Sequence, residues 1–93
     1  MDPSSECARV FVEGRVQDVG FRYNTKARAQ SLYLTGYVRN LPDGRVEIVV
    51  EGPQAAITNF LAQVEQGPPG SRVERISVDR GPASQAYSIF FIK

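Results

Sequence analysis

The sequence predicts an α+β fold in which two helices cover one face of an antiparallel β-sheet. Apolar residues recur at every second position in several segments and at every third or fourth position in two others, which are the periods of strands and helices. These segments follow the order β-α-β-β-α-β, with a closing β run. Because 93 residues suffice for one core but not two, we expect a single domain.

The first strand, loop and helix are expected between residues 8 and 34. Residues 8–14 alternate small or branched apolar residues with larger or charged ones, the period of a half-buried strand. Residues 1–7 show no such pattern, so we expect a flexible N-terminal tail there. Residues 15–20 are too irregular to extend the strand, and a helix over about residues 21–34 follows. Its core-facing residues are Phe21, Thr25, Ala29 and Leu32.

A hairpin and a second helix are expected next. Residues 36–41 and 45–51 have strand composition, and the turn Pro42-Asp43-Gly44 joins them. Gly52-Pro53 ends the second of these strands and begins a helix, which stops at Gly67-Pro68-Pro69-Gly70. The core-facing stripe of this helix is Ile57, Phe60, Leu61 and Val64.

Two β segments complete the chain. A fourth strand is expected over about residues 72–79, where the spacing from Val73 to Ile76 breaks strict alternation and indicates a bulge. Residues 87–92 form the closing β run. This order of elements is that of the ferredoxin-like α/β sandwich, and we expect it to occupy residues 8–93.

The composition limits the classes of function. With 42% hydrophobic and 23% charged residues the chain is typical of a soluble globular protein. Its 11 basic and 10 acidic residues give no reason to infer a nucleic-acid partner. The sequence has no signal peptide pattern and no apolar run near the roughly 20 residues of a membrane span. We therefore expect a cytoplasmic monomer that binds no membrane.

The scarcity of cysteine and histidine removes several kinds of chemistry. Cys7 is the only cysteine and the chain has no histidine, which excludes an intramolecular disulfide framework and a cysteine-rich metal site. The commonest general base and metal ligand is also absent. We interpret Cys7 as an incidental free thiol, because no histidine is present to activate it.

The loop from Arg15 to Phe21 and the following Arg22 form a candidate phosphate site. A strand, an irregular glycine-containing loop and a helix start together gather free backbone N–H groups, which suit an anion. Arg22 could add a planar, permanently charged fork for two phosphoryl oxygens. From spacing alone, a loop that merely caps its helix, with Arg22 as a surface charge, is an equally good interpretation. The candidate phosphate-binding residues are Arg15, Val16, Gln17, Asp18, Val19, Gly20, Phe21 and Arg22.

Asn40 is the second candidate. It lies at the end of a predicted strand, and its amide can both donate and accept hydrogen bonds. This suits the positioning of a water molecule. The alternative is that Asn40 helps to form the turn before Asp43, which the residue type alone favours.

Two motifs resemble those of the acylphosphatase family. Gly14-Arg15-Val16-Gln17 followed by Val19-Gly20-Phe21-Arg22 resembles the signature G-x-V-Q-G-V-x-F-R, and residues 36–47 resemble G-x-V-x-N followed by D-G-x-V-E. The resemblance extends over residues 8–93. It implies hydrolysis of acyl phosphates such as acetyl phosphate, carbamoyl phosphate or 1,3-bisphosphoglycerate, without a metal or an organic cofactor. It also implies that Arg22 and the loop amides bind the phosphoryl group and that Asn40 orients the attacking water.

Asp18 departs from the family pattern, which usually has glycine at this position. A carboxylate about 5 Å from a phosphate costs about 3 kcal/mol at an effective dielectric near 20, and much less if it points into water. We therefore expect Asp18 to weaken phosphate binding. It also raises the alternative of a degenerate, regulatory or binding domain with weak or no activity. A ferredoxin-like RNA-binding module is disfavoured, because residues 45–51 lack aromatic stacking positions.

Overall fold

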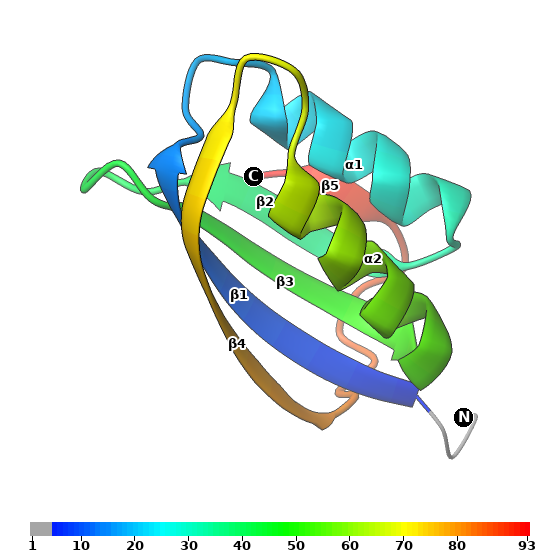
Figure 1. The fold of residues 1–93 in the computed structure, drawn as a ribbon. Coiled ribbons are helices and arrows are strands. Elements are labelled where there is room, and N and C mark those ends of the chain that lie inside the picture. The colour runs from blue at the N-terminus through cyan, green and yellow to red at the C-terminus, as the bar shows by residue number, and fades with distance from the viewer. Residues whose placement is uncertain (1–4) are drawn as a thin grey trace.

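The computed structural model describes residues 5–93 as a five-stranded sheet with two helices on one of its faces (Figure 1). This confirms the α+β, ferredoxin-like fold and the expected order of elements. The elements are β1 Ser5–Arg15, α1 Phe21–Ser31, β2 Thr35–Asn40, β3 Val46–Pro53, α2 Gln54–Gln66, β4 Arg72–Pro82 and β5 Phe90–Ile92.

The strand order in the sheet is β4-β1-β3-β2-β5, and the sheet is mixed rather than antiparallel throughout. The β1–β3, β1–β4 and β2–β3 pairs are antiparallel, whereas β5 runs parallel to β2. Residues 83–89 carry the chain from the β4 edge to the opposite edge, where β5 lies beside β2 (Figure 1). β4 runs in the opposite direction to β2, and the chain reverses once between β4 and β5. β5 therefore runs in the same direction as β2. The prediction of an all-antiparallel sheet was wrong for this last strand.

The core lies between the sheet and the two helices. The helices contribute the buried residues Phe21, Thr25, Ala29, Ile57, Phe60 and Val64. The strands contribute alternate side chains, for example Val10 and Val12 of β1 and Ile48 and Val50 of β3, all of them fully buried. The Phe60 and Phe90 rings meet at 6.3 Å between centroids, so β5 is joined to α2. Both predicted helical stripes face this core, although Leu32 and Leu61 are only partly buried.

Several boundaries differ from the sequence expectation. β1 begins at Ser5, because Glu6 pairs with both Gly52 and Pro82, so residues 5–7 are strand and not tail. The rest of the predicted tail, residues 1–4, lies outside the described residues. α1 ends at Ser31, three residues early, since Tyr33 has a φ of 58° that no helix accommodates.

The predicted irregularity in the fourth strand is a β-bulge. Glu13 pairs with Arg75 and Gly14 with Val73, which leaves Glu74 as the extra residue on β4. Gly14 has a φ of 131°, and a Cβ there would collide with the carbonyl oxygen of Arg72. The bulge therefore requires glycine, and it lies just before the point where the candidate loop leaves β1.

Candidate active site

The loop between β1 and α1 is fixed at both ends by buried side chains. Val16 is 1% exposed and Phe21 is 2% exposed, so each is anchored in the core. Between them the backbone turns sharply: Asp18 has a φ of 62° and Gly20 has a φ of 75°. Asp tolerates this left-handed region better than most residues do, which explains how it can stand where glycine is usual in the family. Aspartate is thus compatible with the backbone that this loop adopts.

The backbone N–H groups of this loop have no acceptor among residues 5–93. In the described part of the chain, none of the backbone N–H groups of residues 17–23 donates a hydrogen bond to the protein. The next N–H along the chain, that of Asn24, donates to the Gly20 carbonyl at 3.0 Å. The helix that follows has no side-chain N-cap and no acidic residue in its first turn. Its partial positive charge is thus unmatched, and an anion can accept from these groups.

Arg22 lies in the first turn of α1 and is half-buried. Among residues 5–93 it has no ion-pair partner. A cation at the N-terminus of a helix opposes the macrodipole, at a cost of about 0.3–1 kcal/mol. A bound anion would reverse that cost, so the placement favours an anion site over a solvated surface charge.

Asn40 is the last residue of β2, opposite Val46 of β3. The hydrogen bonds of the adjoining turn are made by other residues: the Leu41 N–H donates to the Arg45 carbonyl at 2.8 Å, and the Gly44 N–H donates to the Leu41 carbonyl at 3.1 Å. The Oδ1 atom of Asn40 is buried and has no partner among the described residues. The interpretation of Asn40 as a turn-forming side chain was therefore wrong.

A cavity of about 190 Å³ brings these residues together. It is lined by Val16, Asp18, Gly20, Phe21, Arg22, Tyr23 and Asn40. Arg15, Gln17 and Val19, which the sequence also indicated, do not border it. Tyr23 borders the cavity as well, although it was not among the residues predicted from the sequence. Its one sequence signal was its position directly after Arg22 at the start of the helix.

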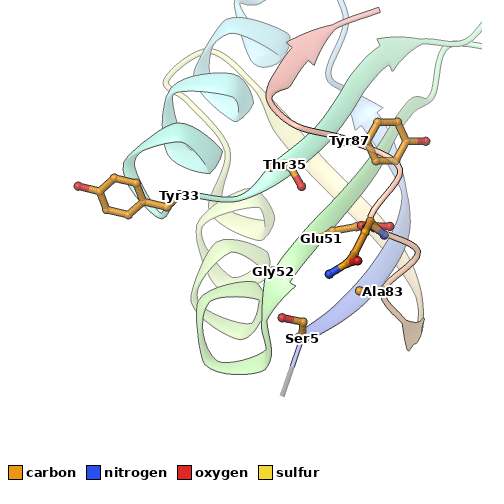
Figure 2. A pocket seen from close by; sticks show the side chains of 8 residues that line it. Ser5, Tyr33, Thr35, Glu51, Gly52, Ala83 and Tyr87 are labelled. Atoms are coloured by element: carbon orange, nitrogen blue, oxygen red, sulfur yellow. Dashed lines mark hydrogen bonds between the residues drawn. The ribbon is translucent and has the colours of Figure 1, made fainter. Parts of the chain in front are cut away.

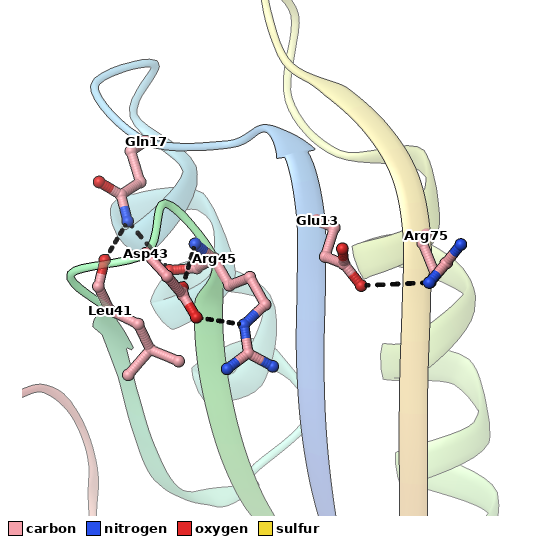
Figure 3. Close-up of polar contacts among 6 residues, drawn as sticks. All are labelled: Glu13, Gln17, Leu41, Asp43, Arg45 and Arg75. Atoms are coloured by element: carbon pink, nitrogen blue, oxygen red, sulfur yellow. Dashed lines mark hydrogen bonds and ion pairs between the residues drawn. The ribbon is translucent and has the colours of Figure 1, made fainter.

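The Gln17 side chain has a different role from that of a phosphate ligand. Its Nε2 donates to the Leu41 carbonyl at 2.8 Å and to the Arg45 carbonyl at 3.0 Å (Figure 3). Only its backbone N–H therefore remains free for an anion. The side chain instead ties the loop to the β2–β3 hairpin, which carries Asn40.

Two larger hollows lie elsewhere on the molecule and have different chemistry. One, of about 280 Å³, is lined by Tyr33, Glu51, Tyr87 and their neighbours (Figure 2). Its buried Glu51 carboxylate already accepts hydrogen bonds from the Ser84 N–H at 3.1 Å, the Ser84 Oγ at 2.6 Å and the Gln85 N–H at 2.9 Å. Burial alone would raise the pKa of Glu51, but these bonds outweigh it and hold the pKa below its ordinary value.

The other hollow, of about 360 Å³, contains Cys7, Arg9 and Asp79. Burial, followed by the nearby Glu51 carboxylate, raises the pKa of the Cys7 thiol, which makes it a poorer nucleophile. Within the described residues no three His, Cys, Asp or Glu side chains gather as metal ligands. No helix between residues 5 and 93 is long and apolar enough to cross a membrane.

Comparison with known proteins decides the family. The acylphosphatase family model matches residues 8–92. The chain belongs to the acylphosphatase family. An acylphosphatase of Acaryochloris marina is 47% identical over 85% of each chain, and one of Methanococcoides burtonii is 46% identical over 94% of this chain and 91% of that one. The crystal structure of acylphosphatase from Bacillus subtilis is similar, with 42% identity, a TM-score of 0.92 and coverage of 95% and 98% of the two chains.

The activity follows from this membership. The protein is an acylphosphatase, which hydrolyses the carboxyl–phosphate bond of a small acyl phosphate to a carboxylate and inorganic phosphate. The identity of about half the residues over most of the chain supports this activity and not the degenerate binding domain that Asp18 suggested. RNA binding loses its support as well, because that alternative rested on the fold alone.

Proposed function

We propose that hydrolysis takes place in the 190 Å³ cavity between the loop and the end of β2. One observation carries this assignment. A guanidinium without an ion-pair partner among residues 5–93, an unpartnered buried amide oxygen and several residues with free backbone N–H groups all border this one cavity. The buried oxygen is costly without a partner, and an acyl phosphate with its attacking water would satisfy all three kinds of group.

In this proposal the phosphoryl group is held by Arg22 and the loop amides. The guanidinium offers a planar fork to two phosphoryl oxygens, and the N–H groups at the start of α1 donate to the third. These charges and dipoles are fixed before the substrate arrives. They stabilise the charge that spreads over the phosphoryl oxygens in the transition state without reorganising.

Asn40 orients the attacking water. The water oxygen forms a bond to phosphorus while the bond from phosphorus to the acyl oxygen breaks in line with it, and the electron pair leaves with the carboxylate. The water proton passes to a phosphoryl oxygen, so that the products of the dianionic substrate are a carboxylate and dihydrogen phosphate. A carboxylate is a good leaving group, so positioning and charge stabilisation suffice without histidine. We expect no metal or organic cofactor.

Asp18 affects phosphate binding through its charge rather than through backbone strain. Its φ of 62° is one that aspartate adopts readily, and its side chain is exposed. Water therefore screens the carboxylate, and we expect the Asp18→Gly variant to lower the KM for acetyl phosphate by about two- to fivefold at low salt. An unchanged KM would show that the carboxylate does not reach the bound phosphate.

We also propose that the enzyme acts as a monomer in the cytoplasm. Its only cysteine, Cys7, is unpaired, as is usual in a reducing compartment. The domain has a core of its own that buries most of its large apolar residues, which favours a monomer. Size-exclusion chromatography with light scattering would test the monomer, and a stable dimer would contradict it.

The experiment for the site compares three arginine and asparagine variants. Arg22→Gln and Asn40→Ala should each reduce kcat/KM for acetyl phosphate by about 100-fold or more, by analogy with the loss of one oxyanion donor. Arg28→Gln is the matched control, because it removes the same charge from the last turn of the same helix. Inhibition by inorganic phosphate should weaken in Arg22→Gln alone. Full activity in either of the first two variants would overturn the assignment.

A further inference from the structure

The cavity has a buried floor and an exposed mouth. Val16 and Phe21 at its floor are 1% and 2% exposed. Asp18 is exposed and Tyr23 is 71% exposed, although both border the same cavity. These are the two side chains of the lining that face the solvent most, so they flank the way in.

The far end of a longer acyl chain lies at this mouth. The free N–H groups and Arg22 hold the phosphoryl end, and the 190 Å³ of the cavity has room for a phosphoryl group, a water and a small acyl group such as acetyl. A longer acyl chain therefore extends outward between Asp18 and Tyr23. The charge of Asp18 and the apolar ring of Tyr23 therefore influence which acyl groups bind well.

The charge at the mouth is uncompensated. Within residues 5–93, Asp18 has no ion-pair partner. Its carboxylate therefore repels a second negative charge on the acyl group, in addition to any effect that it has on the phosphoryl group itself. The Tyr23 ring on the same mouth offers an apolar surface to an uncharged chain.

We propose that Asp18 and Tyr23 make this enzyme selective for acyl phosphates whose acyl group is uncharged, and that they discriminate against acyl groups with a second anionic substituent. The inference rests on the proposed location of the active site. For two unit charges about 8 Å apart at an effective dielectric between about 40 and 80, the discrimination is about two- to sixfold in kcat/KM at low salt. It declines as ionic strength rises.

Crotonyl phosphate and the monophosphate of fumarate form a matched pair of probes. They share one trans chain and differ by a methyl group against a carboxylate, and the trans double bond prevents that carboxylate from attacking the acyl phosphate. The native enzyme should prefer crotonyl phosphate. Asp18→Asn, which keeps a residue that tolerates positive φ, should reduce this preference two- to sixfold at 20 mM salt and little at 0.5 M.

Asp79→Asn serves as the control for lost charge. Asp79 of β4 lies opposite Arg9 in the register of β1 and β4. Arg9 is six residues before Arg15 on β1, so Asp79 lies about 20 Å from the start of the loop. The loss of its charge should leave the preference unchanged. Tyr23→Ser should reduce kcat/KM for crotonyl phosphate about fivefold more than for acetyl phosphate, because the longer chain loses its apolar contact.

The outcomes separate this inference from the proposed site. An unchanged preference in Asp18→Asn, with crotonyl phosphate still hydrolysed and Arg22→Gln inactive, would refute the selectivity and leave the site intact. Full activity of Arg22→Gln would refute the site itself. An equal change in Asp79→Asn would show that net charge, and not the mouth, sets the preference, and would also overturn the inference.

Discussion

Replacing Gln17 with leucine should damage both the stability and the activity of the enzyme. The substitution keeps the size of the side chain but removes the two hydrogen bonds that Nε2 donates to Leu41 and Arg45, at 2.8 and 3.0 Å. Both carbonyls keep one other donor, from Gly44 and from Leu41 respectively. Neither acceptor is therefore left wholly without a partner.

The magnitude follows from these contacts. Each hydrogen bond contributes about 0.5–1.5 kcal/mol, so the free energy of unfolding should fall by about 2 kcal/mol. For a domain of this size that corresponds to a decrease in Tm of about 10 °C. The loop would also lose its tie to the hairpin that carries Asn40. A displacement of about 1 Å between the phosphoryl group and its water can cost about 100-fold, so kcat should fall well beyond the effect on KM.

The assay measures thermal unfolding by circular dichroism and steady-state hydrolysis of acetyl phosphate at 25 °C. Ile57→Val is the control, because this fully buried residue belongs to α2 and its truncation costs about 1 kcal/mol without removing a hydrogen bond of the loop. It should lower Tm and leave kcat unchanged. If Gln17→Leu lowers Tm but keeps the native kcat, the side chain does not position the loop. If Tm is also unchanged, the two hydrogen bonds contribute nothing net.

Other substitutions test the scaffold. Gly36→Ala should lower the free energy of unfolding by more than about 3 kcal/mol in urea titrations, because its Cβ would collide with the Val49 carbonyl at a φ of 133°. Phe60→Ala should cost about 3–5 kcal/mol by the same measurement. Glu51, whose folded-state pKa is depressed, contributes stability that is fully present above its ordinary value of 4.5 and is lost as pH falls through the lower folded value. Glu51→Gln should therefore be less stable at pH 7 and show a smaller loss of stability between pH 5 and pH 3, measured by urea titration at each pH.

Local signals in the sequence predicted most of the fold. Alternation and helical periods located the strands and helices, and glycine with proline marked their ends, as Gly67 does after α2. Even the bulge beside Gly14 followed from one irregular spacing, between Val73 and Ile76. These features depend on neighbours in the chain, which is why the chain alone reveals them.

Features that depend on distant partners were missed or left open. The run at residues 87–92 indicated a strand, but not that β5 would lie parallel to β2. The partners of Gln17 lie 24 and 28 residues away, and no pattern marks them. Asn40 gave the same signal as a turn residue until its unpartnered oxygen appeared beside the cavity. Pairing across the sheet, and not local propensity, determines each of these.

The positive φ at Asp18 has a consequence for how this loop can change over time. The phosphate cradle would consist of main-chain groups, so position 18 needs only a residue that tolerates a φ of 62°. Glycine, asparagine and aspartate meet that requirement best. In the genetic code, aspartate is one base change from glycine and one from asparagine. A lineage can thus add or remove a charge at the mouth in single steps while the loop keeps its backbone.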